Sequence, residues 1–270
     1  MARDGPPQQR GGPEPADSGW SSRVVTAWWQ RGFTAGADPE YVEQLLPLAA
    51  RHLAGGGRVL DVGCGEGQLS RLAASVPGVT RVTGVDVSWL QLSAASQRGG
   101  AVSYARADAT GLPFPPGSFD AVVACLVFEH LADGERALSE VGRVLVPGGR
   151  FIFFLNHPLL QAPGSGWVDD DILGEQYWRL GPYLRSDHSL EEVDAGVWIP
   201  YVHRPLSIYV NALAEAGLVV TRMEEPAPPP GFLAAAAEYP EAATIPRLMF
   251  LRAEKLLAAR RPGDAPRRAQ

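Results

Sequence analysis

The sequence predicts an α/β fold built on a parallel sheet, and three observations indicate it. A short apolar run at residues 58–62 leads straight into a glycine-rich turn and a helical pattern. A second strand pattern ends on Asp86, about 20 residues beyond that turn. Strand and helix patterns then alternate across residues 55–156, and such alternation favours parallel strands joined by right-handed crossovers.

The segment ahead of the first strand, residues 20–54, predicts an N-terminal helical cap. Apolar residues recur at helical spacing across residues 24–29 before the pattern breaks. A second helix is expected to begin at Pro39, with Asp38 as its N-cap, because proline suits the first helical position and aspartate accepts hydrogen bonds from the free N–H groups.

The expected core, residues 55–156, alternates strands with helices. Pro147, Gly148 and Gly149 form a turn that stops the last of these helices and leads into the next strand. The strands are expected near residues 58–62, 81–86, 102–106, 119–125 and 150–155, and the helices near residues 67–76, 88–97 and 134–146.

The stretch at residues 157–205 is too long, and too rich in tryptophan and tyrosine, to be a plain loop. We interpret it as a substrate lid inserted over the carboxyl edge of the sheet. Residues 206–256 then complete the core, and the tails at residues 1–19 and 257–270 are expected to be disordered. In this last part of the core we expect a helix at 205–216, a strand at 218–223, a proline-rich loop at 226–231 and the last strand within 245–255.

The composition favours a soluble catalytic domain. The 270 residues carry a formal net charge of −6, so there is no basic face for nucleic acid. No window has the length of apolar sequence that a membrane span requires. Cys64 and Cys125 match neither a zinc pattern nor a disulfide framework, so we expect no metal and a cytoplasmic location. Lys255 is the only lysine, which excludes a P-loop lysine in the core.

A glycine turn and two acids define a candidate ligand site. Gly63, Gly65 and Gly67 remove every Cβ that would keep a ligand from the backbone, and the turn presents N–H groups at the positive end of a helix dipole. Asp86 ends the second strand, where a carboxylate can accept two hydrogen bonds from a ribose diol. Asp108 follows the third strand. Both acids could instead be helix N-caps.

Five motifs follow one another at residues 59–67, 84–88, 107–114, 119–120 and 145–150. Together they resemble the class I S-adenosylmethionine-dependent methyltransferases. The resemblance implies a Rossmann-like three-layer sandwich whose seven-stranded sheet is mostly parallel with an antiparallel last strand. It also implies S-adenosyl-L-methionine as cofactor and S-adenosyl-L-homocysteine as product. In this family the N-terminal segment often closes the pocket, although the aromatic residues of the cap could equally be core.

The resemblance assigns roles to residues at the strand ends. Gly63 and Gly65 would border the methionine portion, Asp86 would bind the ribose hydroxyls, and Asp108 with the backbone of Ala109 would read the adenine edge. The cofactor-binding residues expected in full are Asp61, Gly63, Gly65, Asp86, Val87, Asp108, Ala109, Cys125, Leu126 and His130.

Three residues of the inserted segment are candidates for the acceptor side. His157 follows the fifth strand and could be a general base, or only a turn residue ahead of Pro158. His203 could contact the substrate or form part of a hinge beside Arg204. Tyr177 could stack on an aromatic acceptor or act as a hydrophobic latch.

The expected activity is transfer of a methyl group to N, O or C of a small organic acceptor, aromatic or indole-like. One alternative is a nicotinamide-dependent oxidoreductase, which the Gly-x-Gly-x-Gly spacing disfavours. Another is a non-catalytic cofactor-binding protein. A monomer or homodimer is expected, with a small-molecule acceptor and no nucleic-acid or membrane partner.

Overall fold

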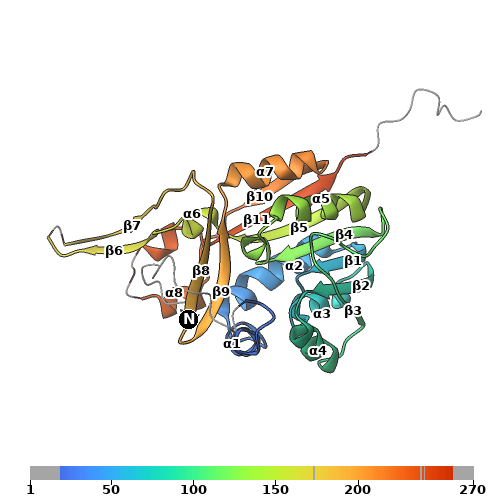
Figure 1. The fold of residues 1–270 in the computed structure, drawn as a ribbon, viewed down its shortest axis with the longest axis horizontal. Coiled ribbons are helices and arrows are strands. Elements are labelled where there is room, and N and C mark those ends of the chain that lie inside the picture. Colours follow the sequence, from blue (N-terminus) through green and yellow to red (C-terminus); the bar gives the residue numbers. More distant parts are fainter. Residues whose placement is uncertain (1–18, 173, 238, 240, 258–270) are drawn as a thin grey trace, which may run out of the picture.

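A computed structural model describes residues 19–257 of the chain except 173, 238 and 240. Its main feature is a seven-stranded sheet in the order β10-β11-β5-β4-β1-β2-β3 (Figure 1). The strands are β1 (Gly57–Val62), β2 (Val79–Asp86), β3 (Val102–Arg106), β4 (Phe119–Cys125), β5 (Leu145–Asn156), β10 (Leu218–Glu224) and β11 (Leu248–Lys255).

The direction of the strands confirms the predicted sheet. β1 pairs in parallel with β2 and β4, and the parallel pairing continues to β3 on one side and β5 on the other. Only β11 runs antiparallel to its neighbours, β5 and β10. The chain leaves β1 toward β2 and later returns to β4 on the other side, so the strand order reverses at β1, which is where open α/β sheets bind ligands.

The core lies in two apolar clusters, one on each face of the sheet. In β5, Phe151 and Phe153 face one cluster and Ile152 and Phe154 face the other, as expected for a strand buried on both sides. Figure 1 shows α5 and α7 covering one face and α2, α3 and α4 covering the other. These helices are α2 (Leu46–Leu53), α3 (Gln68–Ser75), α4 (Trp89–Gln97), α5 (Gly134–Val144) and α7 (Leu206–Glu215).

The helices of the N-terminal cap begin at polar residues. In α1 (Arg23–Phe33), Ser22 Oγ accepts hydrogen bonds from the Val24 and Val25 amides at 3.1 and 3.3 Å. In the second helix, Asp38 Oδ1 accepts from the Tyr41 amide at 3.1 Å, which confirms the predicted N-cap. This helix passes through a π-helical segment, η1 (Tyr41–Leu45), before it continues as α2.

Two predicted loops differ in the structure. The turn at residues 147–149 lies inside β5, because Phe119 pairs with Leu145 and Ala121 with Arg150, which leaves residues 146–149 as a bulge. Gly148 adopts a φ of +77° there, which only glycine adopts readily. The proline-rich loop ends earlier than predicted because Pro230 opens α8 (Pro230–Ala235), where proline is tolerated. The predicted tails lie outside the described residues, apart from Gly19 and Leu257.

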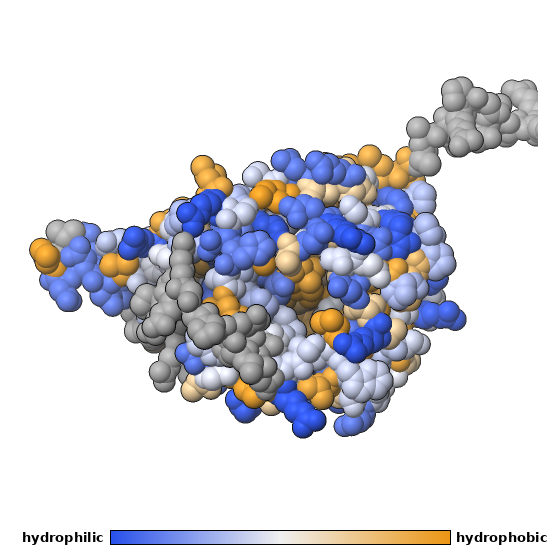
Figure 2. Space-filling view, in the orientation of Figure 1, coloured by the Kyte–Doolittle hydropathy of each residue, from blue (hydrophilic) through white to orange (hydrophobic). Residues whose placement is uncertain are grey.

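The inserted segment forms a short helix and two separate hairpins. The first hairpin, which we call the arm, joins β6 (Gly166–Asp170) to β7 (Glu175–Arg179) and projects from the body. Figure 2 shows the arm standing clear of the molecule, with a mostly hydrophilic surface and some hydrophobic residues near its end. The second, the supporting hairpin, joins β8 (Asp187–Asp194) to β9 (Val197–His203). The remaining short helices are α6 (Pro158–Gln161), η2 (Phe128–His130) and η3 (Ala242–Thr244).

The supporting hairpin packs against α1. Val25 of α1 lies in one buried cluster with Val197 and Ile199 of β9. The Gly19 amide also donates to the Trp198 carbonyl at 3.0 Å. The insertion therefore supports the N-terminal cap. None of the described helices is long and apolar enough to cross a membrane.

Candidate active site

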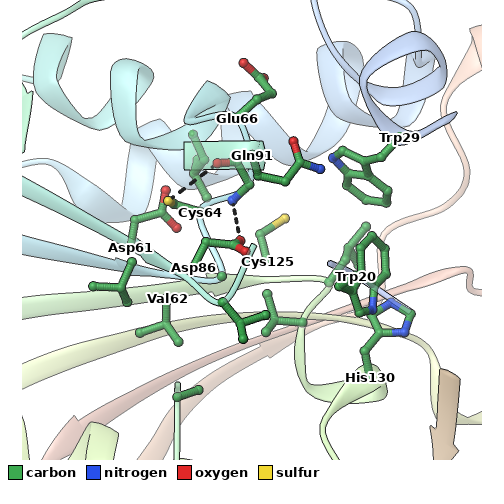
Figure 3. A pocket seen from close by; sticks show the side chains of 18 of the residues that line it. Trp20, Trp29, Asp61, Val62, Cys64, Glu66, Asp86, Gln91, Cys125 and His130 are labelled. Carbon is green, nitrogen blue, oxygen red and sulfur yellow. Dashed lines mark hydrogen bonds between the residues drawn. The ribbon is translucent and has the colours of Figure 1, made fainter. Parts of the chain in front are cut away.

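One cavity of about 210 Å³ lies at the carboxyl ends of the central strands. The ends of β1, β2 and β4 and the residues after β3 form its floor, and aromatic residues of the cap lie across it (Figure 3). All ten residues that the sequence predicts as cofactor-binding line this cavity: Asp61, Gly63, Gly65, Asp86, Val87, Asp108, Ala109, Cys125, Leu126 and His130.

The three glycines of the turn have different tasks. Gly63 and Gly67 have φ values of +69° and +80°, and a Cβ on either would overlap a neighbour, Val127 or the Tyr104 hydroxyl. Gly65 has a φ of +54°, but its Cβ would have only Trp29 Nε1 within 4 Å, at 3.8 Å. Gly65 therefore leaves space toward the cavity, whereas the other two permit close packing.

Asp86 holds the glycine turn and faces the cavity. Its Oδ2 accepts a hydrogen bond from the Gly65 amide at 2.8 Å, and its Oδ1 accepts from the Ser88 amide at 2.7 Å. Burial raises the pKa of Asp86 despite these bonds. Each carboxylate oxygen has a second lone pair, so two ligand hydroxyls can still be accepted.

Asp108 lies at the exposed rim of the same cavity. Its Oδ1 accepts from the amide and the hydroxyl of Thr110, both at 2.8 Å. These bonds orient the carboxylate and leave Oδ2 for a ligand donor.

Asp61 is buried at the floor of the cavity. Its Oδ2 accepts a hydrogen bond from Ser70 Oγ at 2.5 Å. Burial raises the pKa of Asp61 to about 7, and the charge of Asp86 acts in the same direction. Its position behind the glycine turn, bonded to α3, indicates that it stabilises the turn as well as lining the cavity.

Neither cysteine is suited to be a nucleophile. Burial raises the pKa of the Cys64 and Cys125 thiols well above the ordinary value, so both stay protonated near neutral pH. Cys125 and Leu126 at the end of β4 instead form an apolar part of the cavity wall.

The cap supplies the roof, and this part of the site was only partly predicted. Trp29 and Phe33 of α1 stack at 4.4 Å between ring centroids, and both line the cavity with Trp20. Gln30 Nε2 donates to Gln91 Oε1 of α4 at 2.9 Å, which ties α1 to the core next to the cavity. The aromatic residues ahead of the first strand were the available signal, but their pattern could not distinguish a roof from a core.

The structure does not bring the two predicted acceptor-side histidines to this cavity. His157 lies at the end of β5 as expected, but its Nε2 donates to Glu225 Oε1 at 2.7 Å and its Nδ1 accepts from the Leu159 amide at 3.1 Å. His203 is buried and donates from Nε2 to the Tyr183 carbonyl at 2.7 Å. His157 is held at both ring nitrogens and His203 at Nε2, and neither lines the cavity, so their positions do not support the catalytic roles suggested by the sequence.

Tyr177 lies on β7 of the arm, 44% exposed, and does not line the cavity. The next residue, Trp178, packs edge-on against Trp167 at 5.6 Å between ring centroids within the same hairpin. The arm therefore places neither aromatic residue on the acceptor side. Among the residues described, no group of three or more histidine, cysteine or acidic side chains is arranged to hold a metal ion.

The comparisons with known proteins agree in matching this chain to methyltransferases. Residues 60–153 match the family described as "Methyltransferase domain". The chain is 39% identical over 122 residues to a demethylmenaquinone methyltransferase of Thermus thermophilus, which covers 43% of this chain and 54% of that protein. It is 38% identical over 157 residues to 27-O-demethylrifamycin SV methyltransferase of Amycolatopsis mediterranei, covering 56% and 54%. The chain thus spans about half the length of these curated relatives.

A solved structure extends the likeness over most of the fold. An S-adenosylmethionine dependent methyltransferase from Mesorhizobium loti superposes with a TM-score of 0.66 at 29% identity, covering 77% of this chain and 96% of that one. Residues 60–153 thus match a methyltransferase domain, and the fold and the solved structure support a class I S-adenosylmethionine-dependent methyltransferase.

Proposed function

We propose that this chain transfers the methyl group of S-adenosylmethionine to a small organic acceptor. The observation that carries the proposal is the convergence of the glycine turn, two acids and an aromatic roof on one cavity. The relatives' names give demethylmenaquinone and 27-O-demethylrifamycin SV as acceptors, and both are small molecules. A cytoplasmic location and a monomeric or dimeric state remain predictions from the sequence.

The residues present fit this cofactor. The Gly65 backbone is open toward the cavity, and Asp86 keeps lone pairs for the ribose hydroxyls. Asp108 and the backbone of Ala109 would hold the adenine edge, and Gly63 with Gly65 would border the methionine portion.

The chemistry required of the protein is limited. When bound, S-adenosylmethionine supplies a methyl group already activated by its sulfonium. The chain then has to align the acceptor with that group and exclude water, which Trp20, Trp29 and Phe33 do by covering the cavity. A base is needed only if the acceptor must lose a proton.

The proposal is tested by calorimetry with S-adenosylhomocysteine, S-adenosylmethionine and NAD. We expect the first two to bind and NAD not to bind. Asp86→Ala should weaken S-adenosylhomocysteine binding by about 1.5–3 kcal/mol, because charge-assisted hydrogen bonds to the ribose are lost. Asp171→Ala, at an exposed position of the arm, is the matched control and should bind normally.

Two results would change the assignment. If Asp86→Ala bound S-adenosylhomocysteine as tightly as the unaltered chain, Asp86 would not be part of the site. If NAD bound and neither S-adenosyl compound did, the oxidoreductase alternative would be favoured. Cofactor binding without methylation of any hydroxyl, amine or carbon acceptor would favour a non-catalytic binding protein.

A further inference from the structure

His130 is a polar side chain on the aromatic side of the cavity. It ends η2, directly after β4, and lines the cavity. In Figure 3 it lies next to Trp20 and below Trp29, on the opposite side from Asp61 and Asp86. Its place is therefore separate from the acids that we assign to the cofactor.

The supporting hairpin fixes which nitrogen of this ring carries the proton. His130 Nδ1 lies 2.7 Å from the Pro200 carbonyl of β9, and a carbonyl oxygen can only accept, so Nδ1 is the donor. Burial lowers the pKa of His130 to about 4, so the ring is neutral at pH 7 and Nε2 carries a free lone pair. The rings of Trp20 and Tyr201 both pack against the imidazole, with centroids at 4.7 and 4.8 Å from its own.

Among the described residues, the one hydrogen bond given for His130 uses Nδ1, and no arginine or lysine lines the cavity to neutralise a charged acceptor. The neighbouring walls are the rings of Trp20 and Trp29 and the apolar side chains of Leu126 and Leu131. The titratable groups packed near the ring are Glu129 of its own turn and Tyr201 with Glu191 of the supporting hairpin. Burial raises the pKa of each of these three groups, so each favours its neutral form more than usual, and none lines the cavity.

We propose that the acceptor is a neutral, ring-bearing hydroxyl compound and that His130 Nε2 takes the proton of its hydroxyl group. This inference rests on the proposed function and narrows it to O-methylation. The hydroxyl oxygen forms a bond to the methyl carbon while the carbon–sulfur bond breaks and its electron pair stays on sulfur. The hydroxyl proton passes to Nε2 and then to solvent. A weakly basic imidazole suffices, because an oxygen that is gaining a methyl group becomes strongly acidic.

Three compounds with the same naphthalene ring test whether the site prefers a neutral hydroxyl compound. We use 2-naphthol, 2-methoxynaphthalene, which lacks the hydroxyl donor, and 2-naphthoate, which is charged, each titrated into the protein loaded with S-adenosylhomocysteine. We expect 2-naphthol to bind at least about tenfold more tightly than either of the others. In His130→Phe, which keeps a ring between Trp20 and Tyr201 but has no acceptor, the preference over 2-methoxynaphthalene should disappear.

A second variant separates hydrogen bonding from proton transfer. The glutamine side chain of His130→Gln keeps a hydrogen-bond donor and an acceptor but cannot act as a base. This variant should therefore still bind 2-naphthol more tightly than 2-methoxynaphthalene. With S-adenosylmethionine, both His130→Phe and His130→Gln should form 2-methoxynaphthalene about 10²-fold or more slowly than the unaltered chain, as measured by mass spectrometry. His188→Phe, at an exposed position of β8, is the matched control and should keep the normal rate.

Affinity for S-adenosylhomocysteine keeps the outcomes distinguishable. If the unaltered chain does not bind it, the proposed function fails. If it binds but 2-naphthol does not, or 2-naphthoate binds as well as 2-naphthol, the acceptor class is wrong. If both His130 variants bind the cofactor product normally and turn over 2-naphthol at the normal rate, His130 is not the proton acceptor.

Discussion

At the scale of single residues, a substitution of Gly65 can test cofactor binding separately from folding. Its Cβ position points to open space beside the cavity, whereas those of Gly63 and Gly67 are filled by protein. A methyl group at Gly65 would therefore meet a ligand rather than the chain. Gly65→Ala should weaken S-adenosylhomocysteine binding at least about tenfold in calorimetry, while a left-handed φ of +54° on alanine costs only about 1–2 kcal/mol of stability.

Gly217 supplies the control for this prediction. It has a φ of +74° and no atom within 4 Å of a Cβ position, but it lies in the turn between α7 and β10, away from the cavity. Gly217→Ala should therefore lower the melting temperature about as much as Gly65→Ala does. It should leave the affinity for S-adenosylhomocysteine unchanged. Parallel losses of affinity in both variants would mean that Gly65 acts only through backbone strain.

The sequence predicted the residues at the strand ends that line the cavity, but it did not predict the orientation of His157, for a physical reason. Gly65, Asp86 and Asp108 belong to local motifs whose spacing and strand ends fix their positions. His157 also lies at a strand end, but the direction of its ring depends on Glu225, which is distant in the sequence. Such a pairing leaves no local pattern, so the histidine could be placed at the sheet edge while its orientation could not be predicted.

At the scale of elements, the supporting hairpin links the cap to the acceptor side. β9 packs on α1 through Val197 and Ile199, and its Pro200 carbonyl holds His130. The sequence predicted a lid here from composition, without the strand pairings that separate the arm from this hairpin. We propose that residues 157–205 shape the site without covering it, because they hold the aromatic roof and His130 in place.

This proposal predicts an effect of a core substitution outside the cavity. Ile199→Ala should lower the free energy of unfolding by about 2–5 kcal/mol, because a 1% exposed side chain is lost from a packed cluster. It should also weaken S-adenosylhomocysteine binding several-fold, because α1 carries part of the roof. Urea unfolding and calorimetry measure the two effects.

The arm contains a matched residue for the control. Ile172 is 95% exposed, so Ile172→Ala should change neither stability nor affinity. Normal affinity of a folded but destabilised Ile199→Ala protein would show that the cap holds its position without the supporting hairpin.

At the scale of the whole molecule, the carboxyl edge of the sheet concentrates buried acids. Burial raises the pKa of Asp61 and of Glu129 to about 7, and raises that of Asp86 as well. Their charged forms oppose folding of the ligand-free chain, and a cation in the cavity would offset part of that opposition. The edge that is suited to an adenosyl sulfonium is thus expected to be the least stable part of the free protein near neutral pH.

The pH dependence of stability tests this expectation through Asp61→Asn. In the folded chain Asp61 keeps its proton until about pH 7, whereas in the unfolded chain it loses it near the ordinary pKa of 3.8, so the folded state binds more protons between these limits. The stability that Asp61 contributes therefore falls as pH rises from about 4 to 7, and it is level above pH 7.

The histidines make the unaltered chain alone unsuitable for this test. Burial lowers the pKa values of His52, His130 and His203, so these residues change stability in the opposite direction over the lower part of this pH range. The difference between Asp61→Asn and the unaltered chain isolates Asp61, and it should grow in favour of the variant by up to about 4 kcal/mol over that interval in urea unfolding of the ligand-free protein. Asp171→Asn, at an exposed position of the arm, should show a constant difference, and a constant difference for Asp61→Asn would mean that folding does not raise the pKa of its carboxyl group.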